Sequence, residues 1–206
     1  MQLIDTIFYI AVLIMSVVIH EVSHGFMAEY FGDKTARYAG RLTLNPLKHL
    51  DVFGSIILPA LLIITKAPFL LGWAKPVPYN PDNLRNERWG TLAVAAAGVL
   101  ANIFIAIIFG LILRFTVPMG APERFMEIVS LIVFMNLGLA IFNLVPIPPL
   151  DGSKILFAFL PRSFYSIMNV LEQYAFILII LFVVYFADML APILRFAFTL
   201  ITGFAL

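Results

Sequence analysis

The sequence contains no cysteine and few charged residues. Without cysteine, the chain can form no disulfide and can supply neither a thiol nucleophile nor a thiolate metal ligand. Only 12% of its 206 residues are charged, whereas ordinary soluble domains have about 25%. The net charge of +1 provides no basic surface that could neutralise a phosphate backbone, so we expect no nucleic-acid partner.

Apolar residues dominate the composition instead. They make up 62% of the chain, against about 45–50% in soluble domains. A soluble fold of this size could not cover so much apolar surface, so we expect the lipid bilayer to be its solvent. The length suits a single membrane-embedded domain over residues 1–206, with little left for a soluble module.

Uncharged stretches long enough to cross a bilayer recur along the chain. A transmembrane helix needs about 20 predominantly apolar residues, and the prolines after residue 145 must end the helix that precedes them. The pattern predicts an all-α, multi-spanning membrane protein with about five to six transmembrane helices. We expect helices over residues 3–31, 91–116, 125–145, 166–187 and 191–206, of which the last is the shortest.

The stretch from Val52 to Trp73 is apolar, but two prolines and a lysine interrupt it. Basic residues flank it on both sides, and positive charge marks the cytoplasmic face of a membrane protein. A segment with two cytoplasmic flanks enters and leaves by the same face, so we favour a re-entrant hairpin over a full span. The flanking residues are Lys34, Arg37, Arg41 and Lys48 before it, and Lys75, Arg85 and Arg88 after it.

A short segment before this stretch has the alternation of a β-strand. Leu42 and Leu44 alternate with polar residues between Ala36 and Pro46, and a period of two is typical of strands. Because a strand edge cannot face lipid, we expect a short β element at the membrane interface or in a protein-lined cavity.

A cluster of ionisable residues interrupts the first apolar stretch. Residues 20–24 read His-Glu-Val-Ser-His, and residues four apart on a helix project from the same face. This spacing lets His20 and His24 bind one Zn²⁺, with Glu21 beside the fourth coordination position as a general base. Ionisable residues within a span are costly and usually functional. The alternative is that these residues only form the solvent-exposed end of the helix, with Glu21 paired to a lysine.

A catalytic zinc site commonly has three protein ligands, so the chain must supply one more. Asp151 stands out because it follows 23 uncharged residues, and a carboxylate at membrane depth needs a cation such as Zn²⁺. The prolines before it imply irregular backbone, which membranes tolerate only inside protein or beside a cavity. Asp151 could instead cap the next helix. The third histidine, His49, is either a supporting group or an interfacial residue beside Lys48.

Two motifs together carry a family resemblance. They are H-E-x-x-H over residues 20–24 and N-x-x-P-x-P-x-L-D-G over residues 143–152. The chain resembles the site-2 protease family of intramembrane zinc metalloproteases, peptidase family M50. The resemblance covers residues 15–155. Within this range, residues 40–46, residues 72–78, and Gly98 with Asn102 also look like the family. The chain is similar to a minimal, prokaryotic-type member without a PDZ or CBS domain.

The resemblance implies a role for each motif residue. It implies that one Zn²⁺ per chain is bound by His20, His24 and Asp151. It also implies that Glu21 is the catalytic base and that Asn143 contacts the substrate backbone or the oxyanion. Asn102 is a weaker candidate for such a contact, because Val99 stands where the family often has proline. The alternative for Asn102 is a hydrogen bond between helices.

The resemblance further implies a zinc metalloendopeptidase that cleaves membrane proteins in or near their transmembrane segments, as in regulated intramembrane proteolysis. The catalytic core would cover about residues 3–155, followed by C-terminal helices over about 165–206. Expected substrates are single-span regulators, such as an anti-sigma factor or a tethered transcription factor, or remnant signal peptides. We expect a multi-pass protein of the cell membrane whose active site lies below the cytoplasmic surface.

The competing interpretation is a metal-ion-binding membrane transporter, because intramembrane ionisable residues also mark ion pathways. Glu21 discriminates between the two. A transport site could tolerate Glu21→Gln with altered affinity, whereas a hydrolase should lose turnover and keep its metal. A catalytically silent scaffold is a third interpretation, which the intact motif disfavours.

Overall fold

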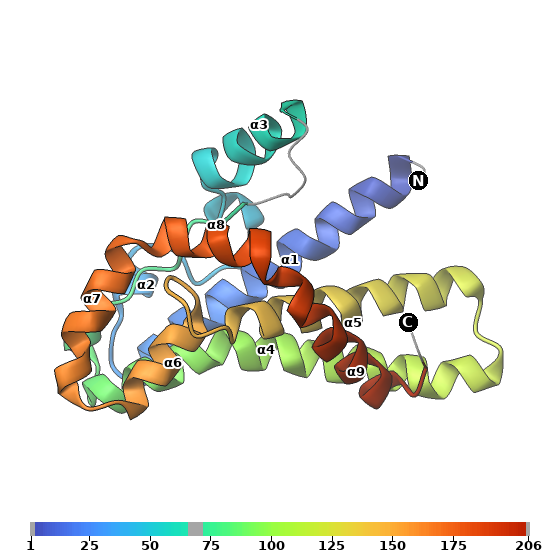
Figure 1. The fold of residues 1–206 in the computed structure, drawn as a ribbon. Helices are drawn as coiled ribbons and strands as arrows, with labels where there is room; N and C mark the ends of the chain where they lie inside the picture. The colour runs from blue at the N-terminus through green and yellow to red at the C-terminus, as the bar shows by residue number, and fades with distance from the viewer. Residues whose placement is uncertain (1–2, 66–71, 205–206) are drawn as a thin grey trace.

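Three long apolar helices form the body of the molecule. The computed structural model describes residues 3–65 and 72–204, without the side chains of residues 3–5 and 162. α1 (Leu3–Tyr30), α4 (Glu87–Thr116) and α5 (Glu123–Asn143) pack against one another. Figure 1 shows α4 and α5 side by side, with α1 crossing them. Each of the three is long and apolar enough to cross a membrane.

Polar residues mark the ends of α4. Asn86 precedes the helix, and its side-chain oxygen accepts a hydrogen bond from the backbone N–H of Trp89, which satisfies one of the free N–H groups at a helix start. Glu87 in the first turn and Arg114 in the last turn have the charges that a helix dipole favours at each end. The helix therefore begins and ends in polar surroundings, with an uncharged stretch between.

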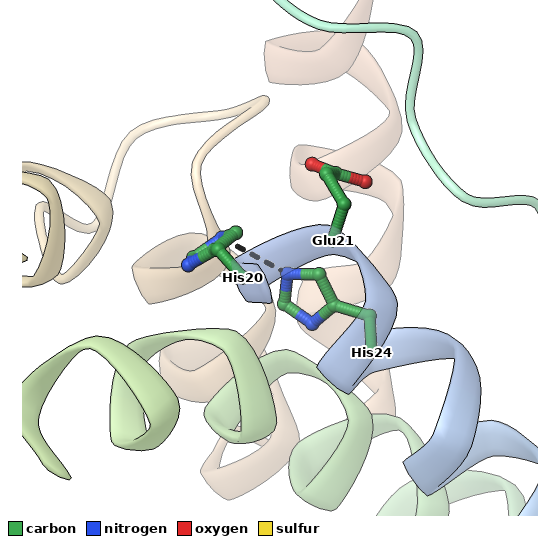
Figure 2. Close-up of side chains that lie close together, drawn as sticks. All are labelled: His20, Glu21 and His24. Carbon is green, nitrogen blue, oxygen red and sulfur yellow. Dashed lines mark hydrogen bonds between the residues drawn. The ribbon is translucent and has the colours of Figure 1, made fainter. Parts of the chain in front are cut away.

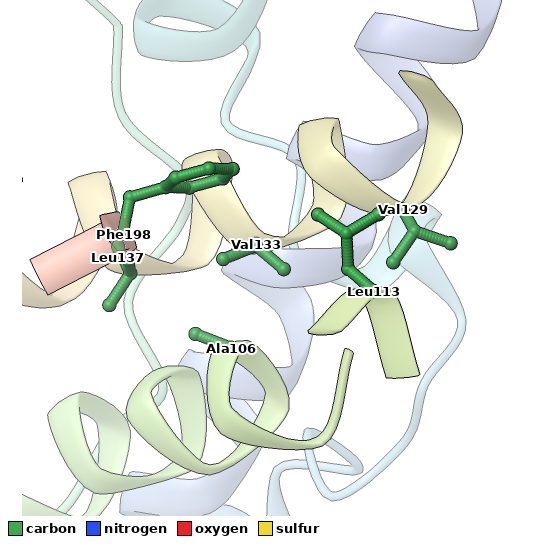
Figure 3. Close-up of a cluster of buried hydrophobic side chains, with 6 residues drawn as sticks. All are labelled: Ala106, Leu113, Val129, Val133, Leu137 and Phe198. Atoms are coloured by element: carbon green, nitrogen blue, oxygen red, sulfur yellow. The ribbon is translucent and has the colours of Figure 1, made fainter. Parts of the chain in front are cut away.

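The buried core lies where α4, α5 and the C-terminal helix α9 (Leu190–Thr202) meet (Figure 3). It is formed by Ala106, Leu113, Val129, Val133, Leu137 and Phe198. Gly110 of α4 allows α9 to come close, because a Cβ at this position would lie 2.4 Å from Ile201. The hydrophobic effect contributes little to the association of helices in a membrane, so small residues that let two helices pack closely stabilise their contact.

The C-terminal third has fewer spanning helices than the sequence predicted. α6 (Asp151–Phe159), α7 (Tyr165–Gln173) and α8 (Ala175–Tyr185) follow α5, and α7 and α8 are bent by 75° relative to each other. α9 has 13 residues, which extend about 20 Å and fall short of a bilayer core of about 30 Å. The prediction of five to six spans is therefore not confirmed: the described residues contain three helices long and apolar enough to cross a membrane, or four if the bent pair is one span.

The two described ends of the segment predicted as a re-entrant hairpin lie against each other. Residues 52–57 form a π-helix, η2 (Val52–Ile57), followed by α3 (Leu58–Ile64), while residues 66–71 lie outside the described chain. The N–H of Trp73 donates to the carbonyl of Gly54 at 3.1 Å, and Ser55 Oγ donates to the Trp73 carbonyl at 2.8 Å. The two described ends of the segment therefore meet, as a hairpin requires, while the path between them includes residues outside the described chain. Its position in a bilayer stays a prediction.

The short β element predicted between Ala36 and Pro46 is wrong. A one-turn helix, α2 (Thr35–Tyr38), occupies its start, and no strand occurs in the described residues. The backbone groups of this segment bond locally. The N–H of Arg41 donates to the carbonyl of Ala36, the N–H of Asn45 bonds to Thr43 Oγ1, and the carbonyl of Thr43 bonds to the His49 ring. Such local side-chain bonds compete with strand pairing, so the alternation marks an extended loop.

Asp33 joins the end of α1 to the turn that leads into α4. Its side chain is fully buried, and it accepts hydrogen bonds from Thr35, from the N–H of Asn80 at 2.7 Å and from Asn83 Nδ2 at 3.0 Å. Burial by itself raises the pKa of Asp33, but the hydrogen bonds outweigh it and hold the pKa below its ordinary value. The ionised carboxylate therefore stabilises this junction.

Replacing Asp33 with Asn should destabilise the protein by about 1–3 kcal/mol at neutral pH, because an amide nitrogen would face buried N–H donors. A lowered folded-state pKa contributes stability above the unfolded value of about 3.9, and this stability is lost as pH falls through the folded-state pKa. Thermal unfolding in detergent across pH should show this acid loss in the wild type and not in Asp33→Asn. Asp82→Asn, at an exposed site nearby, is the control. Equal stability of both variants would contradict the prediction.

Candidate metal centre

The predicted site residues come together from two distant parts of the chain. His20, Glu21 and His24 lie in the C-terminal half of α1, and Asp151 is the first residue of α6. The prolines before α6 prevent α5 from continuing as a helix, and the chain turns so that Asp151 meets α1. His20, His24 and Asp151 are 5%, 9% and 7% exposed, so the site lies inside the protein.

Gly152 lets the start of α6 pack directly on the proline loop. A Cβ at this position would lie 2.2 Å from the carbonyl oxygen of Leu144, closer than atoms can approach. Ser153 also fixes the turn, because its Oγ donates to the carbonyl of Leu150 at 2.7 Å. Asp151 does not cap α6, since Leu150 is the N-cap residue and the Asp151 carboxylate faces the histidines.

Three side-chain atoms converge at nearly equal distances. The Nε2 atoms of His20 and His24 are 3.0 Å apart, as the dashed line in Figure 2 marks. Asp151 Oδ2 lies 3.1 Å from the first nitrogen and 3.3 Å from the second. Zinc binds such atoms at about 2.0–2.2 Å in a tetrahedron, which places ligand atoms about 3.3 Å apart. The three distances are therefore close to those of a zinc ligand set.

The other nitrogen of each ring is occupied by a hydrogen-bond acceptor. His20 Nδ1 lies 2.6 Å from Asn102 Oδ1, and His24 Nδ1 lies 2.7 Å from the carbonyl oxygen of Val94. A carbonyl oxygen can only accept, so both Nδ1 atoms carry the hydrogen. In the neutral rings, both Nε2 atoms then present a lone pair to the centre of the site.

The converging atoms fit a cation. Two imidazole lone pairs meet a carboxylate oxygen, and Asp151 Oδ2 is buried without a hydrogen-bond donor. Buried acceptors that face one another are unfavourable unless a cation or protons lie among them. Two nitrogens and one carboxylate oxygen form a usual three-residue set for a catalytic zinc, with the fourth position open. His20, His24 and Asp151 are therefore suited to hold Zn²⁺.

The facing sides of α1 and α4 make room for the two rings. Residues 16, 20 and 24 of α1 face residues 102, 98 and 94 of α4, and both sets repeat every four residues, which is one face of a helix. Gly98 is the close point: a Cβ there would lie 2.6 Å from atoms of both His20 and His24. The four-residue spacing is visible in the sequence, but the pairing of the two helices is not.

A buried polar chain ties His20 to three helices. Asn102 accepts from His20 and donates through Nδ2 to Asn136 Oδ1 of α5 at 2.8 Å, and Asn136 Nδ2 donates to Ser16 Oγ at 3.0 Å. All three supporting residues are at most 4% exposed. Because its amide is already used, Asn102 is suited to orient His20 and not to bind substrate. Sequence reasoning missed Asn136 and Ser16, which belong to no motif.

Glu21 points away from α4 (Figure 2). Its Oε2 accepts a hydrogen bond from the backbone N–H of Val77 at 2.8 Å, and it forms no ion pair with a lysine among the described residues. The ligand atoms of His20, Glu21 and His24 all lie within 4.8 Å of one another. The Glu21 carboxylate is thus held beside the three converging ligand atoms but is not one of them.

The remaining candidates lie outside this cluster. Asn143 is half-buried, and its Nδ2 donates to the carbonyl of Leu139 at 2.9 Å. No described residue donates to its Oδ1, so its predicted substrate contact stays a prediction. His49 is only 1% exposed and donates from Nε2 to the Thr43 carbonyl at 2.8 Å, so its ring is buried in the protein and bonds within its own loop.

Comparisons with known proteins agree with this chemistry. The chain matches the model of "Peptidase family M50" over residues 8–127 and 120–187. It is 38% identical over 183 residues to "Putative zinc metalloprotease YwhC" of Bacillus subtilis, covering 85% of this chain and 80% of that protein. It is 30% identical over 179 residues to "Putative zinc metalloprotease Rip2" of Mycolicibacterium smegmatis, covering 86% of this chain and 67% of that protein. No solved structure matches the chain significantly.

Adding one methyl group at Gly98 should displace both rings. Gly98→Ala is expected to lower zinc content well below that of the wild type, because His20 and His24 would have to move out of the triangle. Gly138→Ala is the matched control, since a Cβ at Gly138 meets nothing within 4 Å. Zinc analysis of the purified variants tests the prediction. Full zinc content in Gly98→Ala would contradict the geometry of the site.

Asn102→Ala should weaken zinc binding by about 10–100-fold, which is the usual cost of removing the group that orients a metal-binding histidine. Competition with a metal chelator measures the affinity. Asn169→Ala, at an exposed position of α7, should bind zinc as the wild type does. If both variants matched the wild type, Asn102 would have no part in orienting His20.

Proposed function

Since the chain belongs to peptidase family M50 and is a zinc metalloprotease, we propose that it is a metalloendopeptidase that cleaves membrane proteins in or near their transmembrane segments. One observation carries the proposal: the converging Nε2 atoms of His20 and His24 lie within a helix long and apolar enough to cross a membrane. A protease of soluble substrates has no need to place its metal ligands at that depth.

The position along α1 supports an active site within the thickness of the bilayer. The helix ends at Tyr30, ten positions after His20, which corresponds to about 15 Å of helix. The chain beyond that end carries Lys34 and Arg37, and basic residues favour the cytoplasmic side. We therefore place the site below the cytoplasmic surface of the cell membrane, in a multi-pass protein.

The residues divide the chemistry among them. His20, His24 and Asp151 hold the metal, and when bound, Zn²⁺ lowers the pKa of a water molecule to about 7 and polarises a peptide carbonyl. Glu21 acts as the general base, because Val77 holds its Oε2 and leaves Oε1 to accept the proton of the attacking water. The same oxygen then returns the proton to the leaving amine.

The substrate must unfold locally before it is cleaved. A transmembrane helix engages its carbonyl groups in its own hydrogen bonds, so a helical substrate presents no free peptide bond. An unwound segment needs polar partners, and the half-buried amide of Asn143 is our candidate for a contact to its backbone or to the oxyanion. The family resemblance suggests single-span regulators, such as an anti-sigma factor or a tethered transcription factor, or remnant signal peptides.

Glu21→Gln should abolish cleavage without loss of the metal. Purified wild type and variant are incubated with a single-span membrane protein in detergent, and zinc is assayed in the same samples. Removal of a general base is expected to lower the rate by about 10²–10⁴-fold, while about one zinc per chain remains bound in both.

Each other result has a definite meaning. Equal cleavage by wild type and Glu21→Gln would remove Glu21 from the mechanism and indicate a contaminating protease. Zinc in both with no cleavage of any membrane-protein substrate, but with metal transport in vesicles, would contradict the protease proposal and support a transporter.

A further inference from the structure

The segment over residues 75–78, Lys-Pro-Val-Pro, lies against Glu21, and what holds the Val77 N–H in its place there is not part of the chemistry above. Proline has no backbone N–H, so Val77 is the one donor between Lys75 and Tyr79. Both Lys75 and Val77 precede a proline, which restricts them to extended conformations. The Val77 N–H is therefore presented from a stiff stretch of chain, and it donates to Glu21 Oε2 at 2.8 Å.

This stretch belongs to no helix or sheet, and Lys75 fixes it in place through both of its backbone groups. The N–H of Lys75 donates to the His49 carbonyl at 2.8 Å. Its carbonyl accepts a hydrogen bond from Arg41 Nη2 at 2.6 Å. His49 in turn donates from its ring to the Thr43 carbonyl. The loop over residues 41–49 thus holds the peptide that leads directly into Pro76 and Val77.

Arg41 is an unusual residue to use for such a contact. It is 7% exposed, and its Nε is buried without an acceptor. Burying a guanidinium group is costly, and the structure shows no carboxylate paired with Arg41 among the described residues. The cost is offset by a charge-assisted hydrogen bond to a carbonyl two residues before Val77. Its effect therefore reaches Glu21 through the proline-stiffened backbone.

We propose that Arg41 and the Val77 N–H position Glu21: together they hold Oε2 in place and leave Oε1 as the proton-accepting atom. Arg41 is a positioning residue and contacts neither metal nor substrate. The proposal rests on the proposed function, in which Glu21 is the general base. The proposal also assigns a role to residues 40–46 and 72–78, which resemble the family but lie outside the two zinc-binding motifs.

The kinetic test compares Arg41→Gln, Arg41→Lys and Val77→Pro with the wild type. Val77→Pro removes the donor and keeps the extended backbone. Arg41→Gln and Val77→Pro should lower kcat by about 10–100-fold, since a misplacement of about 1 Å in a catalytic group has a cost of this order. KM and zinc content should stay within twofold of the wild type. Arg41→Lys, which keeps the charge and a donor, should fall between wild type and Arg41→Gln.

A matched control is Arg37→Gln, which removes a largely exposed guanidinium that pairs with Glu29 in the same part of the fold. It should leave kcat unchanged. A double-variant comparison then shows whether Arg41 acts through Glu21. In the Glu21→Gln background, Arg41→Gln should lower the residual rate by less than twofold, because residues that act as a unit are not additive.

Hydrogen exchange gives a readout that does not depend on activity. Glu21→Ala should speed exchange of the Val77 amide, and Arg41→Gln should speed exchange at both Lys75 and Val77. Wild-type exchange and wild-type kcat in folded Arg41→Gln would overturn the proposal, as would an equal loss of rate in both Glu21 backgrounds. Full activity of Glu21→Gln would overturn the proposed function instead, so the two failures are distinguishable.

Discussion

Three buried acceptor atoms meet at distances of 3.0–3.3 Å, and this convergence is the constraint on which the rest of the structure depends. Such an arrangement is stable only when positive charge is shared among the acceptors. The Nδ1 atoms of both histidines donate hydrogen bonds to carbonyl oxygens, so the lone pairs of their Nε2 atoms point to the centre of the site. The fold can be understood as a scaffold that brings α1, α4 and the start of α6 together around one cation.

The membrane setting explains why the buried polar side chains around the site bond to one another. A polar group at bilayer depth needs a partner within the protein, and the chain from Ser16 through Asn136 and Asn102 to His20 supplies partners from three helices. Glycine serves the same end by another means. Gly98 admits the imidazoles between α1 and α4, and Gly152 lets α6 begin against the proline loop. The buried hydrogen bonds and the close packing at these glycines both hold the side chains of the site in fixed positions.

The convergence of the candidate site residues could be predicted because their spacing is itself the signal. His20 and His24 share a helix face through local geometry alone, and Asp151 stands out as a lone carboxylate after an uncharged run. The supporting contacts could not be predicted, because they depend on which helix faces lie together. The carbonyl of Val94 and the N–H of Val77 are backbone groups, which leave no mark in a sequence. Asn102 was a weaker candidate for a substrate contact, with a hydrogen bond between helices as the alternative, and its amide bonds to His20 and to Asn136 of α5.

The strand prediction was wrong and the predicted C-terminal spans are not confirmed, and both differences concern the backbone. Alternation at Leu42 and Leu44 indicated a strand, and long apolar runs after residue 165 indicated two spans. The first segment forms local hydrogen bonds, some of them to side chains, and the second breaks at Tyr174, where α7 ends and α8 begins. Composition and period predict what environment a segment needs, but they do not predict where its backbone hydrogen bonds are made.

X-ray absorption at the zinc edge of the purified protein tests the central claim most directly. The account predicts one bound zinc whose spectrum shows two imidazole ligands and further oxygen or nitrogen neighbours, and which is lost when His20 and His24 are both replaced by Ala. A spectrum without imidazole scattering, or one that is unchanged in the double variant, would contradict the assignment of His20 and His24 as metal ligands.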